Sequence, residues 1–158
     1  AQVLAGICDP VLVVGKHPEK LALLEALGIH TVLLSELQSN LDGGLPIDRS
    51  ADVVVDCTGS DTGLPTALSI VRPRGTIVLK TTVAGTQQMP WAPIVIDEVT
   101  IVGSRCGPFD RALDALEAES VSVLPLISTR FDLSDGVSAL DAAKRRGTLK
   151  VLIDVASS

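Results

Sequence analysis

The sequence predicts an α/β fold built on a doubly wound parallel sheet, and two observations lead to this prediction. Strand-like apolar runs alternate along the chain with helical segments of about ten residues, which is the pattern of strands joined by crossover helices. The composition is 46% hydrophobic but only 2% aromatic, so Val, Leu, Ile and Ala must fill the interior, as in sheets covered on both faces. A chain of 158 residues fits one domain.

A strand, a helix and a second strand are predicted in the middle of the chain. The β-branched run at residues 53–55 suits a strand buried on both faces. A helix should begin near Ser60 or Asp61, because either side chain can accept a hydrogen bond from a first-turn amide. Residues 72–75, which include a proline and a glycine, should end that helix, and residues 76–79 should form the second strand. This order predicts a crossover between parallel strands.

Polar residues follow each of these two strands. Thr58 and Gly59 come after the first strand, and residues 80–82 come after the second. The carboxyl ends of parallel strands share one edge of the sheet, where open α/β sheets bind their ligands. Asp56 ends the first strand and should cap the turn that follows it.

The remaining elements are predicted from periodicity and from turn residues. Before the central crossover we expect a helix tail over residues 1–6, a strand over 11–14, a helix from Pro18 to Gly28 with Leu21, Leu24 and Leu27 buried, a strand over 31–34, and a surface connection with one helical turn over 35–50. After it we expect a loop over 84–93, strand material over 94–102, a helix opened by Pro108 with Leu113 and Leu116 facing inward, a strand over 126–131, a helix from Ser134 to Gly147 carrying Val137, Leu140 and Ala143, and a last strand over 149–153.

Charge and cysteine content limit the classes of partner. The formal net charge of −6 argues against nucleic acid or an anionic membrane as the main partner. Cys8, Cys57 and Cys106 are widely spaced and form no CxxC motif, which predicts reduced thiols in a cytoplasmic protein rather than disulfides or a metal site. No apolar run approaches the roughly twenty residues that span a bilayer.

Five segments carry a resemblance to a known family, although no GxGxxG fingerprint occurs in the sequence. In order and spacing they resemble the C-terminal cofactor-binding domain of the medium-chain dehydrogenase/reductase family, the zinc-type alcohol and threonine dehydrogenase group. The segments are VLVVGKHPEKLALLEALG, ADVVVDCTGS, RPRGTIVLKTT, VTIVGSRCGPF and GTLKVLID.

The resemblance implies a Rossmann-like NAD(P)-binding domain over residues 1–158 that lacks its first strand and its glycine-rich turn. In the usual strand order, 3-2-1-4-5-6, the loss of the first strand leaves two inner sheet edges unpaired. The resemblance also implies that the GroES-like domain, which binds the catalytic zinc, is absent from this chain. The chain alone should then be inactive, whereas the parent protein should transfer hydride between NAD(P) and an alcohol or polyol. Relatives assemble through the region of residues 94–102, which predicts a homodimer or homotetramer.

Two other functions stay open on the sequence alone. One is a zinc-independent quinone reductase of the same superfamily, because its cofactor domain is similar. The other is a non-catalytic module that binds nucleotide or a protein partner. A methyltransferase shares the fold class, but the GSRCGPF and GTLKVLID segments have no counterpart in it.

The turn after residue 14 bears on the choice of cofactor. The family commonly has an acidic residue at the end of its second strand, where it binds the ribose of NAD. This sequence has Gly15 there, followed by Lys16 and His17, and a lysine can pair with the 2′-phosphate of NADP. NADP is therefore expected in preference to NAD. Lys20 resembles a family lysine that reaches the adenosine ribose, and the alternative for both lysines is an ordinary surface position.

The resemblance implies further cofactor contacts at the strand ends. It assigns Thr58 and Gly59 to the cofactor ribose, Thr81, Thr82, Ser104 and Arg105 to the nicotinamide side, with Arg105 also suited to a phosphate or a substrate anion, and Lys150 to the pyrophosphate. The alternatives are a plain turn at Gly59, a local ion pair at Arg105 and an exposed edge lysine at Lys150. Cys106 and His17 have no supporting partners nearby in the sequence, so we assign no catalytic and no metal-binding residue.

Overall fold

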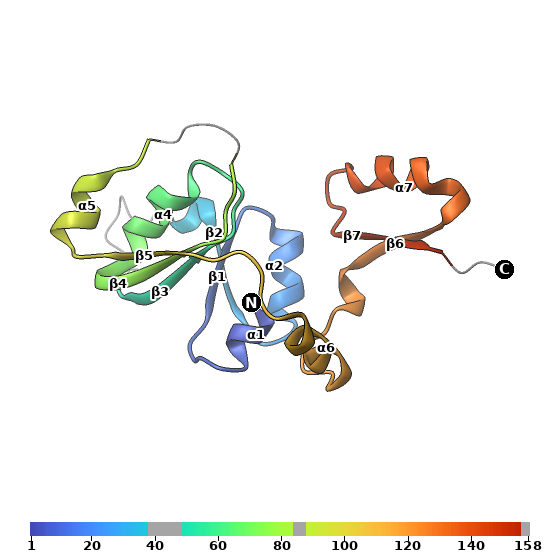
Figure 1. The fold of residues 1–158 in the computed structure, drawn as a ribbon, viewed down its shortest axis with the longest axis horizontal. Coiled ribbons are helices and arrows are strands. Elements are labelled where there is room, and N and C mark those ends of the chain that lie inside the picture. The colour runs from blue at the N-terminus through green and yellow to red at the C-terminus, as the bar shows by residue number, and fades with distance from the viewer. Residues whose placement is uncertain (38–48, 84–87, 156–158) are drawn as a thin grey trace. The chain divides into compact units, whose positions relative to one another are not determined.

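The computed structural model describes residues 1–37, 49–83 and 88–155. The chain divides into two compact units. The terminal unit consists of Ala1–Glu36 together with Phe109–Ser158, and the central unit consists of Leu37–Pro108. Figure 1 shows their helices and strands. The connection predicted over residues 35–50 falls largely outside the described residues.

The central unit contains a three-stranded parallel sheet in the order β3-β4-β5. Its strands are β3 (Ala51–Asp56), β4 (Val71–Leu79) and β5 (Thr100–Gly103). Helix α4 (Gly63–Ile70) joins β3 to β4 and packs on both strands (Figure 1). The predicted order of strand, helix and strand is therefore confirmed, but α4 begins at Gly63 after an N-cap at Thr62 that makes no side-chain capping bond, and not near Ser60 or Asp61.

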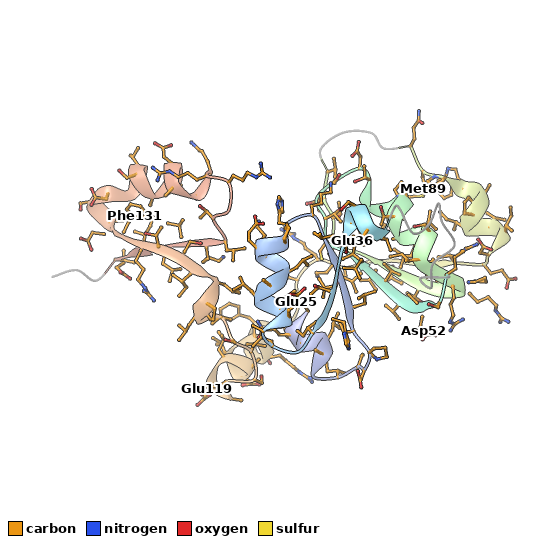
Figure 2. The ribbon with its side chains drawn as sticks, turned by 180° about the vertical axis from the view of Figure 1, so that it is seen from behind. Glu25, Glu36, Asp52, Met89, Glu119 and Phe131 are labelled. Carbon is orange, nitrogen blue, oxygen red and sulfur yellow. The ribbon has the colours of Figure 1, made fainter. Side chains whose placement is uncertain are left out.

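The hydrophobic core of the central unit lies between α4 and the sheet. It is made of Leu64, Ala67, Leu68, Val71, Ile77 and Val99. Met89, labelled in Figure 2, is partly buried and packs against this cluster. The apolar positions of α4 recur three to four residues apart, so one face of the helix is buried. This packing fixes the level at which β3 and β4 end.

Residues 72–75 do not end the helix as predicted, because α4 stops at Ile70 and the chain is already extended at Val71. The pairing of β3 with β4 shifts here, from Ala51 opposite Val71 to Val53 opposite Thr76. A proline is tolerated at a bulge because the backbone amide of a bulged residue need not donate a hydrogen bond to the neighbouring strand. The four residues are thus an irregular part of β4.

Helix α5 (Trp91–Ile96) replaces the end of the predicted loop and the start of the predicted strand at residues 94–102. Only Thr100–Gly103 forms a strand in this region. Pro93 lies in the first turn of α5, where backbone amides have no helical acceptor, so a proline costs little there. Residues 84–87 of the predicted loop lie outside the described residues.

The first half of the terminal unit contains a two-stranded parallel sheet of β1 (Leu12–Gly15) and β2 (His30–Leu33), joined by α2 (Pro18–Glu25). Helix α1 (Gln2–Ala5) precedes them, as predicted for residues 1–6. Leu21 of α2 is buried, but Leu24 is only half-buried and Leu27 is exposed. The predicted buried stripe is wrong at Leu27, because α2 ends two residues before it.

The second half contains α6 (Phe109–Glu117) and a parallel pair of β6 (Ile127–Asp132) and β7 (Lys150–Asp154), joined by α7 (Gly136–Ala143). Phe131, labelled in Figure 2, belongs to β6. The two short 3-10 turns are Leu124–Leu126 and Leu133–Asp135. The predicted burial of α6 is wrong, and α7 buries small rather than large residues. The exposed residues are Leu113, Leu116, Val137 and Leu140, whereas Ala139 and Ala142 are buried.

Strand pairing within the described residues gives separate β1-β2 and β3-β4-β5 sheets. The predicted loss of a first strand stays a prediction. None of the described helices is long and apolar enough to cross a membrane.

Candidate functional site

The three strands of the central unit end at one level. Asp56 lies opposite Leu79, and Leu79 lies opposite Gly103. We call residues 56–60, 79–82 and 103–105 the carboxyl rim. Six of the predicted site residues belong to the rim, namely Thr58, Gly59, Thr81, Thr82, Ser104 and Arg105. The structure therefore brings together the ends of three neighbouring strands, as the sequence predicts.

Asp56 is the centre of the rim's hydrogen bonds and is only 4% exposed. Its Oδ1 accepts from the Thr58 amide at 3.0 Å, from the Thr58 hydroxyl at 2.9 Å and from the Thr81 hydroxyl at 2.8 Å. Its backbone oxygen accepts from the amides of Lys80, at 2.8 Å, and Thr81, at 3.1 Å. A buried carboxylate needs such donors to offset its lost hydration. The predicted capping role of Asp56 is confirmed, and the same side chain also joins the exits of β3 and β4.

Gly63 lets the start of α4 approach this carboxylate. A Cβ atom at Gly63 would lie 2.5 Å from each carboxylate oxygen of Asp56 and closer still to the Thr58 hydroxyl. A real Cβ cannot approach so closely, so only glycine fits here without displacing Asp56. The packing of α4 and the rim network therefore depend on the same residue.

Gly59 is an open, exposed part of the rim. Its φ of 65° is the left-handed conformation that glycine adopts without strain. Apart from Gly59 and its two chain neighbours, no atom of the described residues lies within 4 Å of the place where a Cβ would stand. Its amide donates to the Thr81 hydroxyl at 3.1 Å. The backbone at Gly59 can therefore be approached closely by a ligand.

Lys80 joins the exits of β4 and β5. Its ammonium group donates to the Arg105 backbone oxygen at 2.6 Å and to the Ser104 hydroxyl at 3.3 Å. The Ser104 amide in turn donates to the Leu79 oxygen at 2.9 Å. The segment after β5 is thus held against the segment after β4, while the Arg105 side chain stays exposed.

The remaining predicted site residues belong to the terminal unit. Gly15 ends β1, and a Cβ there would lie 2.8 Å from Leu21, so glycine permits close packing of α2 on β1. His17 precedes α2 without a side-chain capping bond, and its Nδ1 lies 3.8 Å from a Glu19 carboxylate oxygen. Lys150 is the first residue of β7 and is exposed.

Four predicted cationic residues have no ion-pair or side-chain hydrogen-bond partner within the described residues. They are Lys16, Lys20, Arg105 and Lys150. No described acidic side chain pairs with any of these four charges. Among residues 1–37, 49–83 and 88–155, no group of three His, Cys, Asp or Glu side chains could hold a metal ion.

Sequence reasoning missed two features of the rim. One is the hydrogen bond between Asp56 and Thr81, and the other is the pair of bonds from Lys80 to Ser104 and Arg105. Each joins residues more than twenty positions apart, so neither follows from local pattern. The signal that could have revealed these bonds is the register of the neighbouring parallel strands. An acid that ends one parallel strand lies beside the hydroxyl residue that follows the neighbouring strand.

A family model described as zinc-binding dehydrogenase matches residues 2–119. The chain belongs to this family. The resemblance predicted from the five segments is thereby confirmed, and with it a Rossmann-like arrangement of parallel strands and helices.

Individual relatives agree with this assignment. Sorbitol dehydrogenase of Mus musculus is 31% identical over 104 residues, which cover 65% of this chain and 29% of that protein. A structure described as a zinc-binding dehydrogenase from Sinorhizobium meliloti 1021, bound to NADP, has a TM-score of 0.85 at 21% identity, covering 98% of this chain and 48% of that one. An Escherichia coli CFT073 alcohol dehydrogenase in complex with NADH has a TM-score of 0.81 at 21% identity, again covering 98% of this chain and 48% of that one. The chain thus spans less than half the length of these relatives.

Proposed function

We propose that this chain is the nicotinamide-dinucleotide-binding part of an oxidoreductase that moves hydride between an alcohol or polyol and the dinucleotide. The observation that carries the proposal is the carboxyl rim, where three strand exits are locked together around Asp56 and Lys80. Membership of the zinc-binding dehydrogenase family supports it. The dinucleotides bound to two proteins of the same fold support it further.

The rim residues fit a dinucleotide in shape and charge. The left-handed, open backbone of Gly59 admits a ribose closely, and the exposed Arg105 offers a positive charge. The nicotinamide supplies the hydride-accepting ring, so the task of this chain is to bind the dinucleotide and orient it. We assign Thr58, Gly59, Thr81, Thr82, Ser104 and Arg105 to that task.

We place the catalytic zinc outside this chain. No described group of ligands fits a metal ion, and we therefore derive no metal step from these residues. A reducing, cytoplasmic setting is proposed as well, because Cys8, Cys57 and Cys106 are all free and exposed.

Titration of the natural-length protein with dinucleotides tests the proposed function. NADPH and NADH should both bind, and ADP-ribose, which lacks the nicotinamide, should bind more weakly. A module that serves only to bind a protein partner would bind none of the three. Calorimetry that detects no binding of either dinucleotide would contradict the proposal.

We further propose that the protein prefers NADPH, because Lys16 is exposed and unpaired within the described residues. The Lys16→Ala variant should weaken NADPH binding about tenfold, the worth of a charge-assisted hydrogen bond, and leave NADH binding nearly unchanged. Lys144→Ala is the matched control, since Lys144 is an exposed lysine of the same unit whose partner is Asp141. Equal losses for both dinucleotides in Lys16→Ala would show that Lys16 does not read the 2′-phosphate.

We also propose that the protein forms at least a dimer through β5. This strand ends the β3-β4-β5 order, so within the described residues its outer edge pairs with no strand. An open edge is a ready pairing surface, and a charged side chain on it opposes pairing. Light scattering should report a dimer or tetramer for the natural protein and a smaller species for Val102→Lys. Val137→Lys, at a 77% exposed position of α7, should assemble normally, and a monomeric natural protein would refute the proposal.

A further inference from the structure

Asp56 is a buried acid for which neither the family assignment nor the proposed hydride transfer gives a task. We propose that Asp56 is a positioning residue for dinucleotide binding, which acts by orienting the Thr81 hydroxyl so that this hydroxyl holds the peptide group of Gly59. The inference rests on the proposed function, because it assigns a role within the same rim. It identifies the Asp56–Thr81–Gly59 chain of hydrogen bonds as a unit.

The direction of the Thr81 hydroxyl follows from the partners on each side. A threonine hydroxyl has one proton to donate, and an ionised carboxylate can only accept. Thr81 Oγ1 lies 2.8 Å from Asp56 Oδ1, so its proton points to Asp56. A lone pair is then left for the Gly59 amide, whose nitrogen lies 3.1 Å away. Without the acceptor at Asp56, the hydroxyl could rotate and lose this orientation.

The acceptor itself is held still. Two groups of Thr58 donate to the same Oδ1, and the backbone oxygen of Asp56 accepts from the amides of Lys80 and Thr81. Burial of Asp56 to 4% exposure excludes solvent that could compete for Oδ1. The side chain is therefore kept from a ligand in the open rim and acts through the groups that donate to it, of which the Thr81 hydroxyl is the one that also accepts from the Gly59 amide.

The consequence is a preformed conformation at Gly59. Glycine is the residue with the largest backbone freedom, and its left-handed φ of 65° is here held by the hydrogen bond that the Gly59 amide donates to Thr81, at the exit of another strand. A ligand that binds this peptide group then need not order it first, which removes part of the entropic cost of binding. Loss of the Asp56 carboxylate should raise the dissociation constant without removing a direct contact, because Asp56 is buried.

A double-mutant cycle on the natural-length protein tests this inference, with NADPH as the probe. Thr81→Val and Asp56→Leu keep similar shapes and each break the link, so each should raise the NADPH dissociation constant about tenfold. The dissociation constant of the double variant should also be raised only about tenfold, because both substitutions remove the same link. Losses that multiply to about a hundredfold would mean independent actions and would overturn the inference.

Two further measurements separate positioning from simple stability. Thr66→Val removes a hydroxyl bond of similar length to the Thr62 backbone oxygen on α4, and it should leave NADPH binding unchanged. Thr81→Ser keeps the hydroxyl and should restore binding to within about threefold of the natural protein.

If Asp56→Leu does not fold, the rate of hydrogen exchange at the Gly59 amide in the Thr81 variants tests the inference instead. Faster exchange in Thr81→Val than in Thr81→Ser supports the inference, and equal exchange overturns it. A natural protein that binds no NADPH would instead refute the proposed function.

Discussion

Gly63→Ala is expected to lower the free energy of unfolding of the central unit by about 3 kcal/mol, the combined cost of overpacking and of a disrupted buried hydrogen-bond network. The added Cβ would stand 2.5 Å from both Asp56 carboxylate oxygens. Asp56 is short, buried and held by several donors, so it cannot turn aside without breaking those bonds. The same displacement should weaken dinucleotide binding through Thr81 and Gly59. Urea unfolding and NADPH titration measure the two effects.

Gly136→Ala is the matched control for this change. Gly136 is also the first residue of a helix, α7, but beyond its chain neighbours and the nearby backbone of α7 no described atom lies within 4 Å of the position of a Cβ. Alanine has the higher helix propensity, so this variant should be neutral or more stable by up to about 1 kcal/mol. Equal stability of Gly63→Ala and Gly136→Ala would show that the close approach of α4 to Asp56 is not required.

Ile77→Ala is expected to cost about 2 to 5 kcal/mol of unfolding free energy, the usual range for truncating a buried aliphatic side chain. Ile77 is fully buried in β4, within the core that α4 covers. A cost of this size is a large part of a domain's whole stability. Ile7→Ala, at a position that is 76% exposed, should change stability by less than about 0.5 kcal/mol. Thermal unfolding measures both variants. If the unfolding midpoint falls equally in the two, Ile77 is not part of the core.

The central crossover was predictable because several local signals agree there. A β-branched run ends at Asp56, helical spacing follows, and a second β-rich run begins at Thr76. The structure has β3, α4 and β4 in these places. Since parallel strands end at one edge, the meeting of Thr58, Gly59 and Thr81 could be deduced as well.

The segment from residue 94 shows where local pattern fails. Ile94, Val95 and Ile96 are β-branched and apolar, yet they close helix α5. A short apolar run has no periodicity that separates strand from helix. Packing decides instead, because Ile94 packs against the α4 core while Val95 and Ile96 stay exposed. The prediction for residues 94–99 was wrong for this reason.

The hydrogen bonds of the rim could not be predicted in detail. Whether Asp56 caps only its own turn or also binds Thr81 depends on the exact register of β3 against β4, which places Asp56 opposite Leu79. One residue of slip would reverse the faces and separate these groups. The roles of Lys16, Lys20 and Lys150 also remain predictions, since Lys16 and Lys150 are exposed and Lys20 is half-buried, and neither position identifies a ligand.

Hydrogen exchange of the natural-length protein with and without saturating NADPH tests the central claim most directly. The account predicts that NADPH slows exchange of amides at residues 57–60, 80–82 and 103–105, with the Gly59 amide among the most affected. Helix α7 (Gly136–Ala143) serves as an internal reference that should not change. If NADPH binds and slows exchange elsewhere while these three segments exchange at their free rate, the carboxyl rim is not the dinucleotide site.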